Sequence, residues 1–355
     1  MEYGAIDLHK RESQVRIVTE DGEVLDHRIA TTRERLAALF AGRRPTRILI
    51  EASTESEWVA QHLETLGHHV VVADPNYAPM YGHRTRRVKT DLRDAAALTA
   101  ACLQGNYRPA HRRSERQRAV QRELNVRDEL VQTRTRAILL ARAMTRADGL
   151  RLRSGATETF VRRLNALELP PATATAITPL CRVIDLVTEE LNAADTRFAT
   201  AANADPGLGR LMTLPGVGPI TATAFIAALD DASRFRSPGQ VTSYLGLVPS
   251  EYSSGEKRRR GRVLRSAHPR VQALLVQAAW RVWRSRRPET EGLRRWTRAI
   301  GDRRGKRVAV VALARRLARI LFAMWRDETE FTGVRIRAGG ARPRDAVARP
   351  TAKIA

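Results

Sequence analysis

Four carboxylates are spaced so that they could act on one substrate. Asp7 lies in the first run of β-forming residues, and Glu51 ends a later run. Asp91 and Asp94 open a helical segment three residues apart, so they share one face of that helix. Carboxylates that converge repel one another unless a cation lies between them, and their hard oxygens suit Mg²⁺ or Mn²⁺. The four acids therefore predict a metal site of the kind that stabilises the attacking and leaving oxygens in phosphoryl transfer.

Each of these acids also has a simpler interpretation. Asp91 and Asp94 could be a helix N-cap and an acid of the first turn, which satisfy free N–H groups and the helix dipole. An Asp in a first strand, or a Glu at a strand end, is commonly solvated. His9 lies two residues past Asp7 and would share its face, either as a metal or proton-transfer group or as an ordinary surface or core histidine. The joint placement of the acids favours the metal site.

The first 74 residues predict the framework that would position these acids. The runs 5–7, 14–18, 24–29, 48–50 and 70–72 predict strands, and 33–41 and 55–66 predict helices, with Asp21 and Gly22 as a hairpin turn and Thr32 and Ser53 as helix caps. Three antiparallel strands followed by alternating helices and strands is the order of an RNase H-like α/β domain. In such a sheet the first and fourth strands are neighbours, and a later helix, predicted at 91–103, crosses them.

The middle of the chain predicts two long helices. Residues 114–144 carry a narrow apolar stripe at Val120, Leu124, Val131 and Ile138. A second helix is predicted to begin with Thr178 as its cap and Pro179 in its first turn, and its apolar residues follow at spacings of three and four: Leu180, Ile184, Val187, Leu191, Ala194 and Phe198. Such stripes pair helices. The pairing would form either a hairpin within one chain or a dimer between chains.

Two segments of the last part of the chain could contact phosphate. Residues 214–222, LPGVGPITA, resemble a helix-hairpin-helix element, in which Gly216 and Gly218 would expose backbone N–H groups to a DNA phosphate. The alternative is a tight turn that uses glycine only for positive φ. Residues 253–262 place Ser253 and Ser254 beside Gly255 and a basic run. They predict a flexible anion-binding loop or a loop that presents a nucleophilic serine.

The composition points to nucleic acid. The chain of 355 residues has a net charge of +24, and all but five of its 62 basic residues are arginine, whose planar fork pairs with phosphate oxygens. Its two cysteines lack metal-ligand spacing, which excludes a zinc finger. It contains no run long enough for a membrane span and begins without the apolar core of a signal peptide, so we expect a cytoplasmic protein with no membrane partner.

Five segments in this order resemble one family closely. They are residues 5–10 (AIDLHK), 50–54 (IEAST), 88–95 (VKTDLRDA), 214–219 (LPGVGP), and 244–249 (YLGLVP) running into 253–255 (SSG). They are similar to the DEDD transposases of the IS110 and IS1111 insertion-sequence group, relatives of the Piv DNA invertase. The resemblance covers about residues 1–325.

This resemblance implies an α/β plus all-α architecture. It would comprise an RNase H-like (RuvC-like) catalytic domain at 1–110, a helical coiled-coil linker at 111–205, a mainly helical transposase domain at 206–330 and a disordered tail at 331–355. The family's four acids match Asp7, Glu51, Asp91 and Asp94, which would be catalytic and would bind Mg²⁺ or Mn²⁺. The family's nucleophilic serine, thought to form a phosphoserine link to DNA, matches Ser254, with Ser253 as the alternative.

The resemblance also implies the partners. They are double-stranded DNA at the element ends and the target, a structured noncoding bridge RNA, and further copies of the chain in a dimer or tetramer. The residues expected to bind nucleic acid are Gly216, Gly218, Lys257, Arg258, Arg259, Arg260, Arg262, Arg86, Arg87 and Lys89. Two other functions remain open from the residues: a junction-resolving nuclease that uses only the acids and metal, and a nucleic-acid-binding protein without catalysis.

Overall fold

The computed structural model describes residues 1–82, 90–254, 257–263 and 268–333, with the backbone alone for 250–254 and 257–263. The chain divides into two compact units, Met1–Arg113 and Ser114–Ala355. The division at residue 205 that the sequence suggests stays a prediction. The predicted disordered tail lies outside the described residues from residue 334 onward.

A five-stranded sheet is the centre of the first unit. Its strands are β1 (Glu2–Asp7), β2 (Glu12–Val18), β3 (Val24–Ala30), β4 (Thr46–Glu51) and β5 (His69–Ala73), in the order β3-β2-β1-β4-β5. β1, β2 and β3 pair antiparallel, whereas β4 is parallel to both β1 and β5. All five strands fall where the β-branched runs predict them, and β1 and β4 are neighbours as expected.

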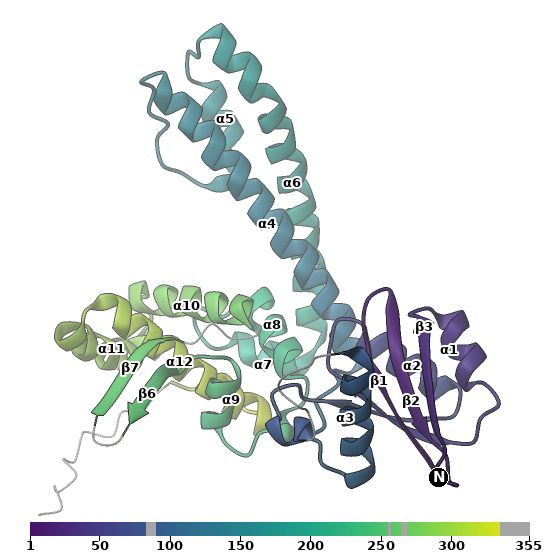
Figure 1. Ribbon diagram of the computed structural model, residues 1–355. Coiled ribbons are helices and arrows are strands. Elements are labelled where there is room, and N and C mark those ends of the chain that lie inside the picture. The colour runs from purple at the N-terminus through teal and green to yellow at the C-terminus, as the bar shows by residue number, and fades with distance from the viewer. Residues whose placement is uncertain (83–89, 255–256, 264–267, 334–355) are drawn as a thin grey trace, which may run out of the picture. The chain divides into compact units, whose positions relative to one another are not determined.

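The two faces of this sheet carry different helices (Figure 1). α1 (Arg33–Phe40) and α2 (Ser56–Thr65) share a core with Ile6, Ile48 and Ile50. α3 (Asp91–Gln104) shares a second core with Ala5 and Leu49. Because side chains alternate along a strand, residues two positions beyond Ala5 and Leu49 belong to the α3 face. Those residues are Asp7 and Glu51.

The two predicted caps of the first helices have different outcomes. Thr32 caps α1, because its side chain accepts a hydrogen bond from the backbone N–H of Arg35. The prediction for Ser53 is wrong. α2 begins at Ser56, and the Ser56 hydroxyl donates to the carbonyl of Ser53 at 3.0 Å and accepts from its N–H at 3.1 Å. The hydroxyl that closes this turn therefore belongs to the helix and not to the residue before it.

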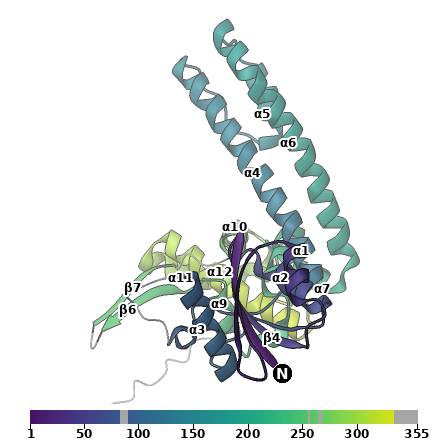
Figure 2. The same ribbon diagram turned by 45° about the vertical axis from the view of Figure 1, so that its right-hand side comes forward.

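Two long helices of the second unit, α4 (Glu115–Ala147) and α6 (Pro171–Ala204), run side by side (Figures 1 and 2). The predicted stripe of α6 is buried at Ile184, Val187, Leu191, Ala194 and Phe198. The two helices thus pair as a hairpin within one chain, which is one of the two arrangements that the sequence leaves open. A bidentate ion pair between Arg127 and Asp195 joins them.

The predicted start of α6 is wrong. The helix begins at Pro171, in the first turn, where a missing N–H costs nothing, and Pro179 lies in its interior. Thr178 is not a cap, because its hydroxyl donates to the carbonyl of Ala174 one turn earlier at 2.8 Å. The apolar stripe extends back to Ile177, which is 1% exposed, and its packing holds the helix through the proline.

The rest of the second unit is mainly helical around one core. α12 (Lys306–Arg326) is central to it, with nine buried residues. The other elements are η2 (Thr157–Thr159), α5 (Phe160–Asn165), α7 (Pro206–Met212), α8 (Pro219–Leu229), η3 (Ala232–Arg234), α9 (Pro238–Tyr244), β6 (Pro249–Ser254), β7 (Lys257–Val263), α10 (Pro269–Arg284), η4 (Pro288–Thr290) and α11 (Glu291–Arg304). The first unit also contains η1 (Ala78–Tyr81). Among the helices of the described residues, none is long and apolar enough to cross a membrane.

Candidate functional site

Strand register places two of the four acids side by side. Ile6 of β1 pairs with Ile50 of β4, so Asp7 and Glu51 each follow at the same level on adjacent parallel strands. Both belong to the sheet face that α3 covers. The alternation that buries Ala5 and Leu49 under this helix therefore also brings the two carboxylates to one edge of the sheet.

The other two acids stand in the first turn of α3. The cap of this helix is Thr90, whose side chain accepts from the N–H of Arg93, so the simpler interpretation of Asp91 as the cap is wrong. The side chain of Asp91 is 58% exposed, whereas Asp94 is only 4% exposed. α3 packs against β1, β2 and β4, so its first turn can bring both acids toward the strand ends.

Three potential ligand atoms come close together at this edge. His9 Nε2 lies 3.5 Å from Asp7 Oδ2 and 3.6 Å from Asp91 Oδ1. One ligand atom from each of these three residues lies within 4.8 Å of the others. Of the four predicted acids, the structure thus brings Asp7 and Asp91 into this group, together with His9.

The remaining two acids act on this group through charge. The pKa of Asp7 is raised above its ordinary value, chiefly because burial disfavours the charged carboxylate. His9 lowers the pKa of Asp7, and three carboxylates raise it further: those of Asp94, Asp91 and Glu51. The charges of the other three acids therefore all act on Asp7. A bound cation would relieve their mutual repulsion.

Basic residues that the sequence analysis did not single out border this acidic edge. A cavity of about 370 Å³ is lined by His9 and Asp91 and also by Lys10, Arg11 and Arg28. Arg28 is held by Glu12 at 2.6 Å. Lys10 is the last residue of the motif 5–10 that contains Asp7, and Arg11 follows it, so their proximity to Asp7 in the sequence was the available signal. The cavity therefore offers positive charge to a phosphate beside the carboxylates.

The two glycines of the predicted helix-hairpin-helix turn have different roles. Gly216 has a φ of +90°, and a Cβ there would lie 2.9 Å from the carbonyl oxygen of Ala278. Close packing and backbone conformation thus account for this glycine, as the alternative interpretation holds. Gly218 has a φ of −115° and precedes α8, where it supplies no side-chain cap. A Cβ at Gly218 would meet nothing within 4 Å, so its surroundings are open.

Three arginines distant in sequence surround this turn. Gly216 and Gly218 line a cavity of about 550 Å³ together with Arg281, Arg284 and Arg287, which come from the end of α10 and the segment after it. The first-turn N–H groups of a helix such as α8 have no intrahelical partner. The cavity thus combines a helix N-terminus with three guanidinium groups, a combination that suits an anion. Sequence analysis missed these three arginines because they lie in an arginine-rich stretch. Only their position in the folded chain distinguishes them from the other arginines there.

The basic segment near the two serines is not a loop, contrary to the prediction. It forms strand β7, which pairs antiparallel with β6. In this register Ser254 is opposite Lys257 and Ser253 is opposite Arg258. Residues 255–256 lie outside the described residues, as do Arg86, Arg87 and Lys89, which were expected to bind nucleic acid. Strand pairing therefore fixes the backbone of both serines within a two-stranded hairpin.

Comparisons with known proteins identify the family. A family model described as transposase matches residues 5–146, and one described as transposase IS116/IS110/IS902 family matches residues 208–293. A probable family 20 transposase of Pseudomonas aeruginosa is 30% identical over 91% of this chain and 96% of its own length. The chain belongs to the IS110-type transposase family.

Other members of the IS110-type family match over nearly the same span. The transposase for insertion sequence element IS1328 of Yersinia enterocolitica is 27% identical, over 92% of this chain and 97% of that protein. The transposase for insertion sequence element IS1111A of Coxiella burnetii is 27% identical, over 91% and 90% of the two chains. The resemblance noted in the sequence is thereby confirmed, and this IS110-type transposase belongs to a class of enzymes that act on DNA.

Proposed function

We propose that this transposase cuts and rejoins DNA strands at the acidic edge of the β3-β2-β1-β4-β5 sheet. The observation that carries the proposal is the grouping of Asp7, Glu51, Asp91 and Asp94 around the ends of β1 and β4. The strand order and the helix across β1 support an RNase H-like catalytic domain. A site that gathers negative charge in a protein of net charge +24 is hard to explain as a general surface feature.

The four carboxylates fit a divalent metal ion. Their oxygens are hard ligands of the kind that Mg²⁺ and Mn²⁺ prefer. Burial is the main cause of the raised pKa of Asp7, and the neighbouring carboxylates add a repulsion that a cation would relieve. Bound Mg²⁺ or Mn²⁺ would neutralise charge that builds up on a reacting phosphate. The carboxylates would hold the ion, and Lys10 and Arg11 of the adjoining cavity would orient the phosphate.

Ser254 is the proposed nucleophile, with Ser253 as the alternative. Its hydroxyl oxygen would form a bond to a phosphorus of the DNA backbone, and the bond from that phosphorus to one deoxyribose oxygen would break, with the proton passing to the departing oxygen. The strand opposite Ser254 carries Lys257, Arg258, Arg259, Arg260 and Arg262, which supply positive charge for the phosphate. Pairing within the hairpin favours a fixed backbone position for the attack.

Nucleic acid would also contact surfaces outside the acidic edge. Gly218 and the arginines beside it would hold a DNA backbone phosphate without reading sequence. A structured noncoding RNA is the proposed second partner, whose base pairing with donor and target DNA would carry sequence choice. Further copies of the chain, in a dimer or tetramer, would bring two DNA sites together.

Substitution of the acids tests the catalytic assignment. We expect Asp7→Asn and Asp94→Asn to lose strand cleavage in Mg²⁺ while they keep their affinity for duplex DNA. Loss of a residue that only hydrogen-bonds to a metal ligand lowers activity roughly 10- to 100-fold, and loss of a direct ligand should lower it further. Glu23→Gln is the control, since Glu23 is an exposed acid in the turn between β2 and β3. Full cleavage by either variant would contradict the assignment, and loss in the control would point to a general charge effect.

Trapping a covalent product tests the serine. Denaturation during the reaction and proteolysis should yield a peptide from residues 248–257 that carries a nucleotide, and Ser254→Ala should lose it. Loss of the adduct in Ser253→Ala instead would assign the attack to Ser253. Cleavage without any adduct would favour a junction-resolving nuclease that needs only the acids. Binding without cleavage under any condition would favour a non-catalytic nucleic-acid-binding protein.

A further inference from the structure

We propose that a cavity at the end of α4 binds a phosphate group of a nucleic-acid backbone. The cavity measures about 540 Å³ and is lined by three arginines, Arg142, Arg146 and Arg151, with Thr145, Gly149, Leu150 and Leu152. No acidic residue is among the lining residues that the structure describes. A concave site with this much like charge invites an anion.

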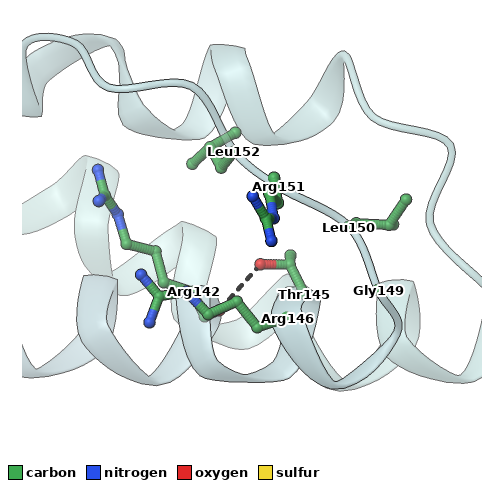
Figure 3. Close-up of a pocket in the computed structure, with 7 residues that line it drawn as sticks. All are labelled: Arg142, Thr145, Arg146, Gly149, Leu150, Arg151 and Leu152. Carbon is green, nitrogen blue, oxygen red and sulfur yellow. Dashed lines mark hydrogen bonds between the residues drawn. The ribbon is translucent and has the colours of Figure 1, made fainter.

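The end of α4 folds back over itself to form the cavity. Gly149 has a φ of +78°, its N–H donates to the carbonyl of Arg146, and the N–H of Leu150 donates to that of Thr145. This pair of bonds is a Schellman motif, which reverses the chain at a helix end. The next residues, Arg151 and Leu152, consequently return over the helix, and Figure 3 shows the Arg151 guanidinium over the turn that carries Thr145.

Stabilisation of the C-terminal end of α4 does not explain why three arginines lie there. Cations near a helix C-terminus commonly pair with its free carbonyls or its dipole. Here backbone N–H groups already occupy the carbonyls of Thr145 and Arg146. Arg142 and Arg146 are one turn apart, and like charges at that spacing destabilise a helix by a few tenths of a kcal/mol. A ligand of opposite charge accounts for their placement better than folding does.

Arg142 is held in place but lacks a partner for one donor. Its guanidinium lies 5.6 Å from the ring centroid of Phe160, which is buried beside it. Its Nε is buried, and within the described part of the chain it has no hydrogen-bond partner. A buried N–H without a partner costs free energy. Arg163 braces the same Phe160 ring at 6.0 Å and donates to the carbonyl of Ala156 at 2.7 Å, which fixes the returning segment.

The ligand chemistry follows from the donors. Arginine forks bind phosphate oxygens in pairs, and the cavity has the size of sites that hold a small molecule, so a phosphate with part of its nucleotide fits. That the phosphate belongs to a nucleic acid rests on the proposed function. DNA and RNA offer the same phosphodiester, and the experiment distinguishes them.

The test compares two double variants of the full-length protein. Arg146→Gln with Arg151→Gln removes two exposed guanidinium groups of the cavity and leaves the packed Arg142 in place. Arg122→Gln with Arg182→Gln removes two exposed arginines from the same helical hairpin outside the cavity and serves as the matched control. Each protein is titrated with duplex DNA and separately with a structured RNA across a range of salt concentrations.

We expect the cavity variant to bind DNA or RNA about 10-fold more weakly than the control, because charge-assisted hydrogen bonds to the phosphate are removed. Its salt slope for duplex DNA should be lower than the control's by about 0.9 for each phosphate that the protein no longer neutralises. The nucleic acid that shows the difference is the source of the phosphate. If the two variants have equal affinities and equal salt slopes for both nucleic acids, the cavity does not bind a backbone phosphate. A wild-type chain that binds neither nucleic acid would contradict the proposed function itself.

A photo-cross-link locates the contact independently of charge. p-Benzoylphenylalanine in place of Leu150 should cross-link to the nucleic acid that the salt titrations identify, and excess inorganic phosphate should reduce the yield. The same residue in place of the exposed Leu186 on α6 is the control. Equal yields from the two positions would contradict a site at the end of α4.

Discussion

The acidic edge of the sheet and the arginine-lined cavity at the end of α4 each bring together side chains of one charge, but the backbone elements that carry these side chains differ. The acids stand on two strand ends and the first turn of a packed helix, and Asp94 is buried. Two of the three arginines are exposed, and one of them lies on an irregular segment. Like charges held rigidly should select a small ion, whereas flexible arginines on a surface should hold a larger, hydrated phosphate. Single substitutions should therefore matter more at the acids.

The largest effect that would test this contrast is expected at Asp91. Its side chain is 58% exposed, so Asp91→Asn should leave the thermal midpoint almost unchanged. Cleavage should nevertheless fall by more than about 100-fold if Asp91 is the direct metal ligand that we propose. Single-turnover cleavage in Mg²⁺ and a melting curve of the same preparation measure both. A loss of stability that parallels the loss of cleavage would show that Asp91 acts on the fold.

The two glycines of the turn before α8 offer the next test, with stability as the readout. Gly216→Ala should destabilise the protein by about 2–3 kcal/mol, because the residue has a positive φ and a Cβ would meet the Ala278 carbonyl. Gly218→Ser should leave stability unchanged or slightly higher, since serine is a good N-cap. It should weaken duplex DNA binding if a phosphate approaches this backbone. Denaturant unfolding and DNA titration of both variants separate the two roles.

The basic strand β7 should contribute through charge alone. Replacing Arg258, Arg259 and Arg260 by Gln should lower the salt slope of duplex DNA binding by about 0.9 for each phosphate that these arginines neutralise. The matched control replaces three exposed arginines near the start of α12, Arg303, Arg304 and Arg307. If both sets change the slope equally, β7 is no more than part of a diffuse positive field.

The smallest effect concerns the metal-free acidic edge. Asp7→Asn should stabilise the metal-free protein at neutral pH by on the order of 1 kcal/mol, because it removes a repelled, partly buried charge. The pKa of Asp7 is raised in the folded state, so its protonated form stabilises the fold at low pH, and this stabilisation is lost as the pH rises through the folded-state pKa.

The stability difference between variant and wild type should therefore grow as the pH rises through that range. Added Mg²⁺ should stabilise the wild type more than the variant, since only the wild type keeps all the proposed ligands. Unfolding curves at several pH values, with and without Mg²⁺, measure both trends. A difference that is independent of pH and of Mg²⁺ would contradict the electrostatic account of this edge.

Much of the first unit could be predicted from local pattern. The β-branched runs give all five strands, and Thr32 marks the start of α1. The period of two along a strand places Asp7 and Glu51 on one face, and the helical period does the same for Asp91 and Asp94. Local rules failed where another hydrogen bond or a packing contact was available. The Ser56 hydroxyl, and not that of Ser53, closes the turn at the start of α2. The packing of Ile177 lets α6 begin before Pro179.

The sequence by itself determined where the strands lie along the chain, on which faces the four acids lie and the excess of arginine, because these depend on residue type and short-range periodicity. Only the tertiary structure decided which arginines gather: Arg281 and Arg284 line one cavity with Gly218, and Arg151 lines another with Arg142 and Arg146. In a chain this rich in arginine, composition cannot distinguish a solvated guanidinium from one held in a cavity. That distinction depends on chain reversals and helix packing, which bring residues together without any regular spacing along the sequence.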